Sequence, residues 1–253
     1  MISRPYPFFP FLNCGGSDGE VRVYCFNHAG GSASSYYHLM KNISGAVEIV
    51  PVELAGHGSR MDEPFERDWD SLVNDCCDAV LQLQSASKKP FVLLGCSLGA
   101  LIAFRCALRL EKLGTPAQRL VLCAHSAPQL PVPGYKSSMG IEMLPEEVMK
   151  LGGLSEELIR SEEFHKYFLP IIFLDYQLHD SFKYQGERLM KTPVDSFYGS
   201  GDIYFGRDSM LAWSSAVEGG VSCTEIEGDH FFAYSSEKFQ NELERICLIV
   251  TNK

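Results

Sequence analysis

Six short apolar runs recur along the chain, and each has the length and composition of a buried β-strand. They are rich in β-branched residues, which is typical of parallel strands covered on both faces. The runs are Val21–Phe26, Val47–Val52, Phe91–Leu94, Leu120–Ala124, Val194–Tyr198 and Val221–Ile226.

Helical patterns lie between these runs, and the three clearest are Trp69–Leu83, Leu98–Leu113 and Phe239–Val250. Strands that alternate with helices predict right-handed βαβ units. The expected fold class is therefore α/β, with a mostly parallel central sheet flanked by helices.

The segment from about residue 131 to about residue 191 interrupts this alternation, because it contains no strand-like run. Acids follow Pro145 as in a first helical turn, and Ser155 and Ser161 are candidate helix N-caps. The aromatic stretch Phe164–Phe182 predicts one or two further helices.

Inserted segments in such sheets often cover the carboxyl ends of the strands, where sites form. We therefore interpret residues 131–191 as a helical lid inserted into a single α/β-hydrolase domain that spans residues 1–253. The alternative interpretation is an extra helical layer on the core.

Ser97 is the candidate nucleophile, in the run Gly95-Cys96-Ser97-Leu98-Gly99. A strand precedes this run and a helix follows it, which is the context that gives Gly-x-Ser-x-Gly its catalytic meaning. Glycines two residues before and after the serine remove Cβ atoms that would clash in the tight turn. The alternatives are a serine in an ordinary loop and Cys96 as the nucleophile.

A serine nucleophile needs a general base and an acid that orients it, in the chain order serine, acid, histidine for this strand arrangement. His230 follows the last strand and precedes the last helix, so we choose it over His125, His165 and His179. Asp202 follows the preceding strand. Its rivals are Asp195, Asp208 and Asp229.

Backbone N–H groups should stabilise the oxyanion. One should come from Leu98, directly after the nucleophile, and the other from the loop Asn27–Ser32, which follows the first strand and is rich in small residues. In this loop His28 is a candidate for holding the loop's shape. The mechanism requires no metal and no cofactor.

The composition argues against some classes of partner and indicates the cellular compartment. The formal net charge of −10 argues against nucleic acid, and no apolar run is long enough to span a membrane. Nine cysteines without Cys-x-x-Cys spacing are expected to be mostly buried free thiols in a reducing compartment. Pro5, Pro7 and Pro10 interrupt any signal-peptide core, so we expect a soluble cytoplasmic protein.

Four motifs together resemble the type II thioesterases of nonribosomal peptide and polyketide synthetases. They are Phe26–Ala33, Gly56–Arg60, Gly95–Ala100 and Gly228–Phe232, and the lid pattern Leu151-Gly152-Gly153 with Leu169-Pro170 is also similar. The resemblance runs from about Val21 to about Tyr234. It differs at Cys96, where the family usually has His, at Asn27, where it usually has Pro, and in the turn Leu54–Gly58.

The resemblance implies an α/β-hydrolase with the triad Ser97, Asp202 and His230 and with oxyanion amides at Ala29 and Leu98. It also implies hydrolysis of acyl thioesters from the phosphopantetheine arm of acyl or peptidyl carrier proteins, as editing or release.

Four alternatives stay open. They are medium-chain fatty acyl release from fatty acid synthase, a carboxylesterase, an acyltransferase, and a non-catalytic module that binds carrier proteins. The basic residues Lys183, Arg188 and Lys191, beside the lid, are a candidate carrier-docking surface.

Overall fold

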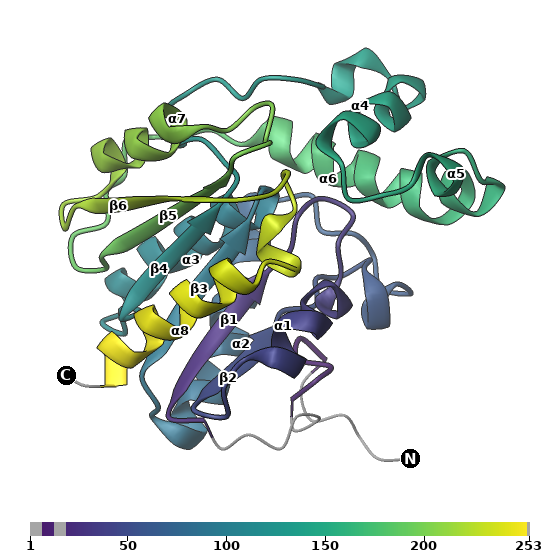
Figure 1. Ribbon diagram of the computed structural model, residues 1–253. Helices are drawn as coiled ribbons and strands as arrows, with labels where there is room; N and C mark the ends of the chain where they lie inside the picture. The colour runs from purple at the N-terminus through teal and green to yellow at the C-terminus, as the bar shows by residue number, and fades with distance from the viewer. Residues whose placement is uncertain (1–6, 13–18, 252–253) are drawn as a thin grey trace, which may run out of the picture.

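The computed structural model describes residues 7–12 and 19–251, and it shows a single six-stranded sheet with helices on both faces (Figure 1). All neighbouring strands are parallel, in the order β2-β1-β3-β4-β5-β6. The strands are β1 (Val21–Phe26), β2 (Val47–Pro51), β3 (Phe91–Cys96), β4 (Arg119–Cys123), β5 (Val194–Gly199) and β6 (Val221–Ile226). The predicted fold class is confirmed.

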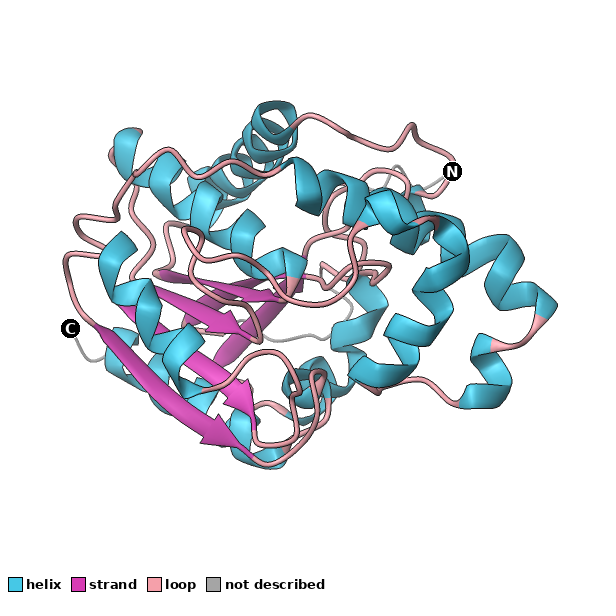
Figure 2. Ribbon diagram, turned by 90° about the horizontal axis from the view of Figure 1, so that it is seen from above, coloured by secondary structure: helices cyan, strands magenta, loops and turns pink. Residues whose placement is uncertain are grey.

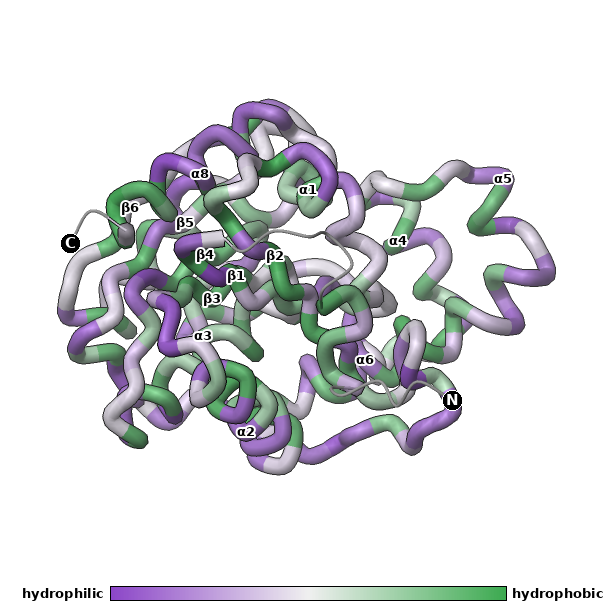
Figure 3. Tube along the Cα trace, turned by 90° about the horizontal axis from the view of Figure 1, so that it is seen from below, coloured by the Kyte–Doolittle hydropathy of each residue, from purple (hydrophilic) through white to green (hydrophobic). Residues whose placement is uncertain are grey.

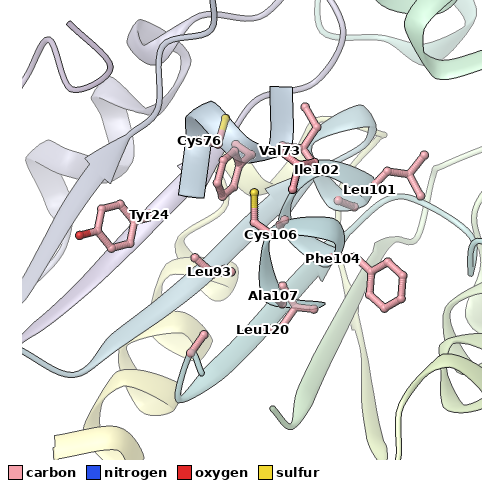
Figure 4. Close-up of a cluster of buried hydrophobic side chains, with 14 of the residues drawn as sticks. Tyr24, Val73, Cys76, Leu93, Leu101, Ile102, Phe104, Cys106, Ala107 and Leu120 are labelled. Atoms are coloured by element: carbon pink, nitrogen blue, oxygen red, sulfur yellow. The ribbon is translucent and has the colours of Figure 1, made fainter. Parts of the chain in front are cut away.

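Helices cover both faces of this sheet, as Figure 2 shows from above. One core cluster joins α2 (Trp69–Ser87) and α3 (Leu98–Lys112) to side chains such as Leu93 and Leu120 on one face of the sheet (Figure 4). The other cluster joins α1 (Tyr37–Asn42) and α8 (Glu237–Thr251) to the opposite face. Because both faces are covered, the inner strands β1, β3 and β4 are buried over nearly their whole length and are mostly apolar.

The residues between β4 and β5 form helices, as predicted, with their own apolar cluster around Leu144, Phe164 and Ile172. Ser155 caps α5 by accepting a hydrogen bond from the Leu158 amide, and the Ser161 hydroxyl accepts one from the Phe164 amide. These helices project beyond the sheet in Figure 1, and Figure 3 shows both hydrophilic and hydrophobic residues in the part of the chain around α5. The elements are α4 (Leu144–Leu151), α5 (Glu156–Ile159), a π-helical turn (Phe164–Phe168) and α6 (Leu169–Ser181).

The sequence pattern did not predict the short helix α1, which has only six residues and is too short for a helical period to be visible. Another short helix is α7 (Arg207–Leu211). Element ends differ by a few residues from the expected ones: α2 runs four residues further, to Ser87.

Among the described residues, no helix combines the length and apolarity that a membrane span requires. Eight cysteines are described; all are free thiols, and seven of them are buried. Pro5, used above against a signal peptide, and Cys14 lie outside the described residues.

The docking of α8 can be tested with two leucines on the same helix. Leu243 is fully buried and Leu248 is 54% exposed. We expect Leu243→Ala to lower the free energy of unfolding by about 2–5 kcal/mol, because it leaves a cavity against the sheet. Leu248→Ala should change it by less than about 0.5 kcal/mol. Equal effects in urea denaturation would contradict the docked arrangement.

Candidate active site

Ser97 occupies a strained turn between β3 and α3. Its φ of 54° and ψ of −121° lie outside the regions that L-residues favour, and its amide donates to the Cys123 carbonyl at 2.9 Å. This backbone places the half-buried serine at the amino end of α3, where the helix dipole favours negative charge.

Gly95 and Gly99 make this turn possible. A Cβ on Gly95 would overlap the Gly99 carbonyl, and a Cβ on Gly99 would overlap the Phe26 carbonyl at the end of β1. The glycine spacing in the sequence therefore reflects two close backbone approaches, as predicted.

His230 and Asp202 form a buried pair between the loops after β6 and β5. His230 Nδ1 lies 2.8 Å from Asp202 Oδ2, and the two side chains are 3% and 0% exposed. Asp202 Oδ1 accepts the amides of Tyr204 at 2.9 Å and Phe205 at 3.2 Å, which fixes the carboxylate. A carboxylate can only accept, so Nδ1 of His230 carries the proton and Nε2 is left as the basic nitrogen of the neutral ring.

A small cavity of about 40 Å³ brings the remaining predicted residues together. Ser97, His230, Ala29 and Leu98 all line it. The amides of Ala29 and Leu98 donate no hydrogen bond to any residue the structure describes, so both are free for a ligand oxygen. This is the arrangement that an oxyanion site requires.

The rival acids are engaged elsewhere. Asp195 lies inside β5 and pairs with Arg119 through two hydrogen bonds of 2.7 and 2.8 Å. Asp229 accepts the Phe231 amide at 2.8 Å, and Asp208 is an exposed residue in the first turn of α7.

The rival histidines and the rival nucleophile have other partners. His125 and His179 also line the small cavity, but they contact each other through their Nε2 atoms at 2.9 Å. His165 is exposed on the π-helical turn. Cys96 packs into the core against α8. Burial opposes its ionisation, but hydrogen bonds with Cys123, Tyr36 and Tyr234 lower the pKa of the thiol.

A larger cavity of about 530 Å³ extends from Ser97 and His230. The loop residues His28–Ser32 form one side of it, and apolar side chains of the helical insertion form the other. The insertion contributes Val148, Leu151, Leu154, Leu158, Phe164, Phe168, Ile172 and Tyr176. Such a cavity suits an apolar chain attached to a carbonyl carbon near Ser97.

His28 holds the loop after β1. Its Nδ1 lies 2.7 Å from the Tyr234 hydroxyl, and its ring packs edge-on against Phe231. Burial, together with the charges of His230 and His57, lowers the pKa of His28 to about 3. The ring is therefore neutral at physiological pH, which agrees with a shape-holding role.

Sequence reasoning missed Asp175 and gave His57 no individual role. The two side chains contact each other behind the loop that carries Ala29. The sequence signal for Asp175 is a lone carboxylate directly after the apolar run Leu169–Leu174. Asp175 lies three residues after Ile172, so the two share a helix face.

The described part of the chain contains no group of three or more His, Cys, Asp or Glu side chains arranged to hold a metal ion.

Known proteins are similar to this chain in sequence and in fold. The family model for the thioesterase domain matches residues 21–249. Thioesterase TesA of Mycobacterium marinum is 30% identical, over 83% of this chain and 84% of its own. The human medium-chain S-acyl fatty acid synthase thioesterase is 27% identical, over 93% of this chain and 90% of its own. YbtT, a type II thioesterase from the yersiniabactin NRPS/PKS pathway, shares the fold with a TM-score of 0.80 at 23% identity, over 93% of this chain and 94% of that structure.

Two buried histidines predict how stability depends on pH. Burial is the main cause that lowers the pKa of both His28 and His125 to about 3, with neighbouring histidines adding to it. Between about pH 3 and pH 6.5 the unfolded chain therefore binds more protons than the folded one at these sites. Their contribution to stability is complete above pH 6.5 and is lost as the pH falls.

We accordingly expect the free energy of unfolding in urea to fall between pH 7 and pH 5. His125→Asn, which keeps a donor near the Ser126 carbonyl, should make this fall shallower. His165→Asn, at an exposed site, should not. The same pH dependence of the unfolding free energy in the wild-type protein and both variants would contradict the lowered pKa of His125.

Proposed function

The chain belongs to the thioesterase domain family, and from this premise we propose that it is a serine thioesterase of carrier-bound acyl groups. Its substrate is the acyl thioester on the phosphopantetheine arm of an acyl or peptidyl carrier protein, in nonribosomal peptide or polyketide synthesis. The observation that carries the proposal is the convergence of Ser97, His230, Ala29 and Leu98 on one small cavity, with Asp202 bonded to His230.

Acylation begins when Ser97 Oγ attacks the thioester carbonyl and its proton passes to His230 Nε2. The carbonyl oxygen becomes an oxyanion, which the amides of Ala29 and Leu98 stabilise. When the intermediate collapses, the carbon–sulfur bond breaks and His230 returns its proton to the departing thiolate. Asp202 keeps the ring oriented throughout.

Deacylation repeats these steps with water. His230 takes a proton from the water, whose oxygen attacks the acyl carbon of the Ser97 ester, and the free acid leaves as Ser97 regains its proton. No residue on this route needs a metal or a cofactor. A non-catalytic carrier-binding module would have no use for this arrangement.

A second candidate is release of medium-chain fatty acids from fatty acid synthase. The similarity to the human medium-chain enzyme and the apolar lining of the large cavity favour it. The chemistry at Ser97 is the same in both, so the acyl chain and the carrier distinguish them.

The proposal also assigns roles to the rest of the chain. The helices within residues 131–191 act as a lid of one α/β-hydrolase domain, since they form one side of the large cavity. The free, mostly buried cysteines suit a cytoplasmic enzyme.

The catalytic assignment can be tested with octanoyl-pantetheine and a matched octanoyl oxygen ester. Ser97→Ala should lower kcat/KM for the thioester by at least about 10³-fold, because no nucleophile remains. Ser200→Ala, at an exposed position after β5, should leave it unchanged. Hydrolysis that survives in Ser97→Ala would exclude the mechanism, and equal or faster turnover of the oxygen ester would exclude the thioesterase assignment.

Carrier docking can be tested at the basic residues that follow α6 in the chain. Arg188 pairs with Glu218 at 3.1 Å, whereas Lys183 and Lys191 are exposed. The double variant Lys183→Glu, Lys191→Glu should raise KM for an acyl carrier protein about 10-fold by repulsion, with no change for acyl-pantetheine. Lys41→Glu on α1 is the matched control. An equal rise for both substrates would refute docking at this surface.

A further inference from the structure

Asp175 of α6 makes a buried contact with two loops of the core. Only 1% of the residue is exposed, and its Oδ2 accepts the Gly30 amide at 2.6 Å and faces His57 Nε2 at 3.0 Å. Gly30 directly follows Ala29, which carries one of the two proposed oxyanion amides. One carboxylate oxygen thus joins the helical insertion, the loop after β2 and the loop after β1.

The contact between Asp175 and His57 is an ion pair. Both ring nitrogens of His57 face acceptors, the Ala55 carbonyl at 3.0 Å and the Asp175 carboxylate, so both carry protons. Burial opposes this charge, but Asp175, the Ala55 carbonyl and Glu53 together raise the pKa of His57 above its ordinary value. The same Asp175 oxygen that faces His57 accepts the Gly30 amide.

A second contact fixes the same point of the loop. Gly30 has a φ of +76°, and a Cβ at this position would overlap Ile172 Cγ1. Ile172 and Asp175 are three residues apart, so they lie on one face of α6. The helix therefore packs on Gly30 with one side chain and accepts its amide with another.

The helix that makes these contacts is itself fixed to the core. Trp69 Nε1 on α2 donates to the Leu178 carbonyl of α6 at 2.8 Å. One residue further, His179 contacts His125 after β4 at 2.9 Å. The face of α6 that carries Asp175 is thus held in place against the core.

We propose that Asp175, paired with His57, is a positioning residue that fixes the Ala29–Gly30 peptide and thereby directs the Ala29 amide, one peptide earlier in the loop, at the oxyanion. Asp175 lines neither cavity beside Ser97, so it acts through the loop rather than on the substrate. The inference rests on the proposed function, since it assigns the Ala29 amide to a reacting carbonyl oxygen.

The test compares Asp175→Ala and Asp175→Asn with the wild-type protein. Misplacing one oxyanion donor should lower kcat on the order of 10–100-fold in Asp175→Ala, with KM changed less than about threefold. Asp175→Asn keeps an oxygen that can accept the Gly30 amide, so its kcat should lie between those of the wild-type protein and Asp175→Ala.

Two inhibitors separate positioning from general damage. An alkyl trifluoromethyl ketone forms a tetrahedral anion on Ser97, whereas a thioether analogue of the substrate binds without one. Both Asp175 variants should lose affinity for the ketone, in proportion to kcat, and keep their affinity for the thioether. Parallel losses for the two inhibitors, or an unchanged kcat, would overturn the proposal.

Asp180→Asn is the matched control, because Asp180 also lies on α6 and its Oδ2 accepts a backbone amide, that of Ser137, at 2.6 Å. It should alter thermal stability while leaving kcat within about twofold. A similar fall in kcat in Asp180→Asn and Asp175→Asn would make the effect structural. If Asp175→Ala does not fold, the ratio of ketone to thioether affinity in Asp175→Asn decides the question.

The substrate is chosen so that the two proposals fail separately. Wild-type protein that hydrolyses an octanoyl p-nitrophenyl ester but no acyl-pantetheine would exclude the proposed function alone. The Asp175 comparison would then be made on the ester, whose hydrolysis develops the same oxyanion.

Discussion

The site depends on how closely the amino end of α3 approaches the end of β1. Gly99 lies against the Phe26 carbonyl with no room for a Cβ, and the loop that carries Ala29 begins one residue after Phe26. This contact sets Leu98 and Ala29, from two different βα loops, on either side of the same small cavity. Without it, a strained Ser97 would face solvent with only one amide beside it.

The sequence predicted most of what local pattern and chain order determine. The six strands are all found because a doubly covered parallel sheet leaves continuous apolar runs, and Ser97, Asp202 and His230 followed from their places after strands. The sequence favoured Asp202 over Asp195, which falls within a strand, and the structure adds that Asp195 already pairs with Arg119. The short helix α1 was not predicted because it is too short to show a helical period. The contact of Asp175 with His57 was not predicted because it joins residues 118 apart in the chain.

The helical insertion has two parts that contact the core to different extents. Helix α6 is tied to the core by Trp69, His125, His57 and the loop after β1, whereas α4 and α5 reach outward and pack mainly on their own cluster. Side chains from both parts line the large cavity. The two parts therefore form the wall of the large cavity together, and α6 is the part that is bonded to the core.

The contacts of α6 with Gly30 also determine where this protein can be joined to a relative in a chimaera. An insertion transplanted whole from a relative would bring a foreign helix onto the loop of the oxyanion site, and its length and contacts would have to match Gly30 and His57. A graft that exchanges only the residues between β4 and α6 would keep Ile172 and Asp175 in place. For chimaeric enzymes with altered chain-length preference, the suitable junction is thus the start of α6, not the ends of the insertion.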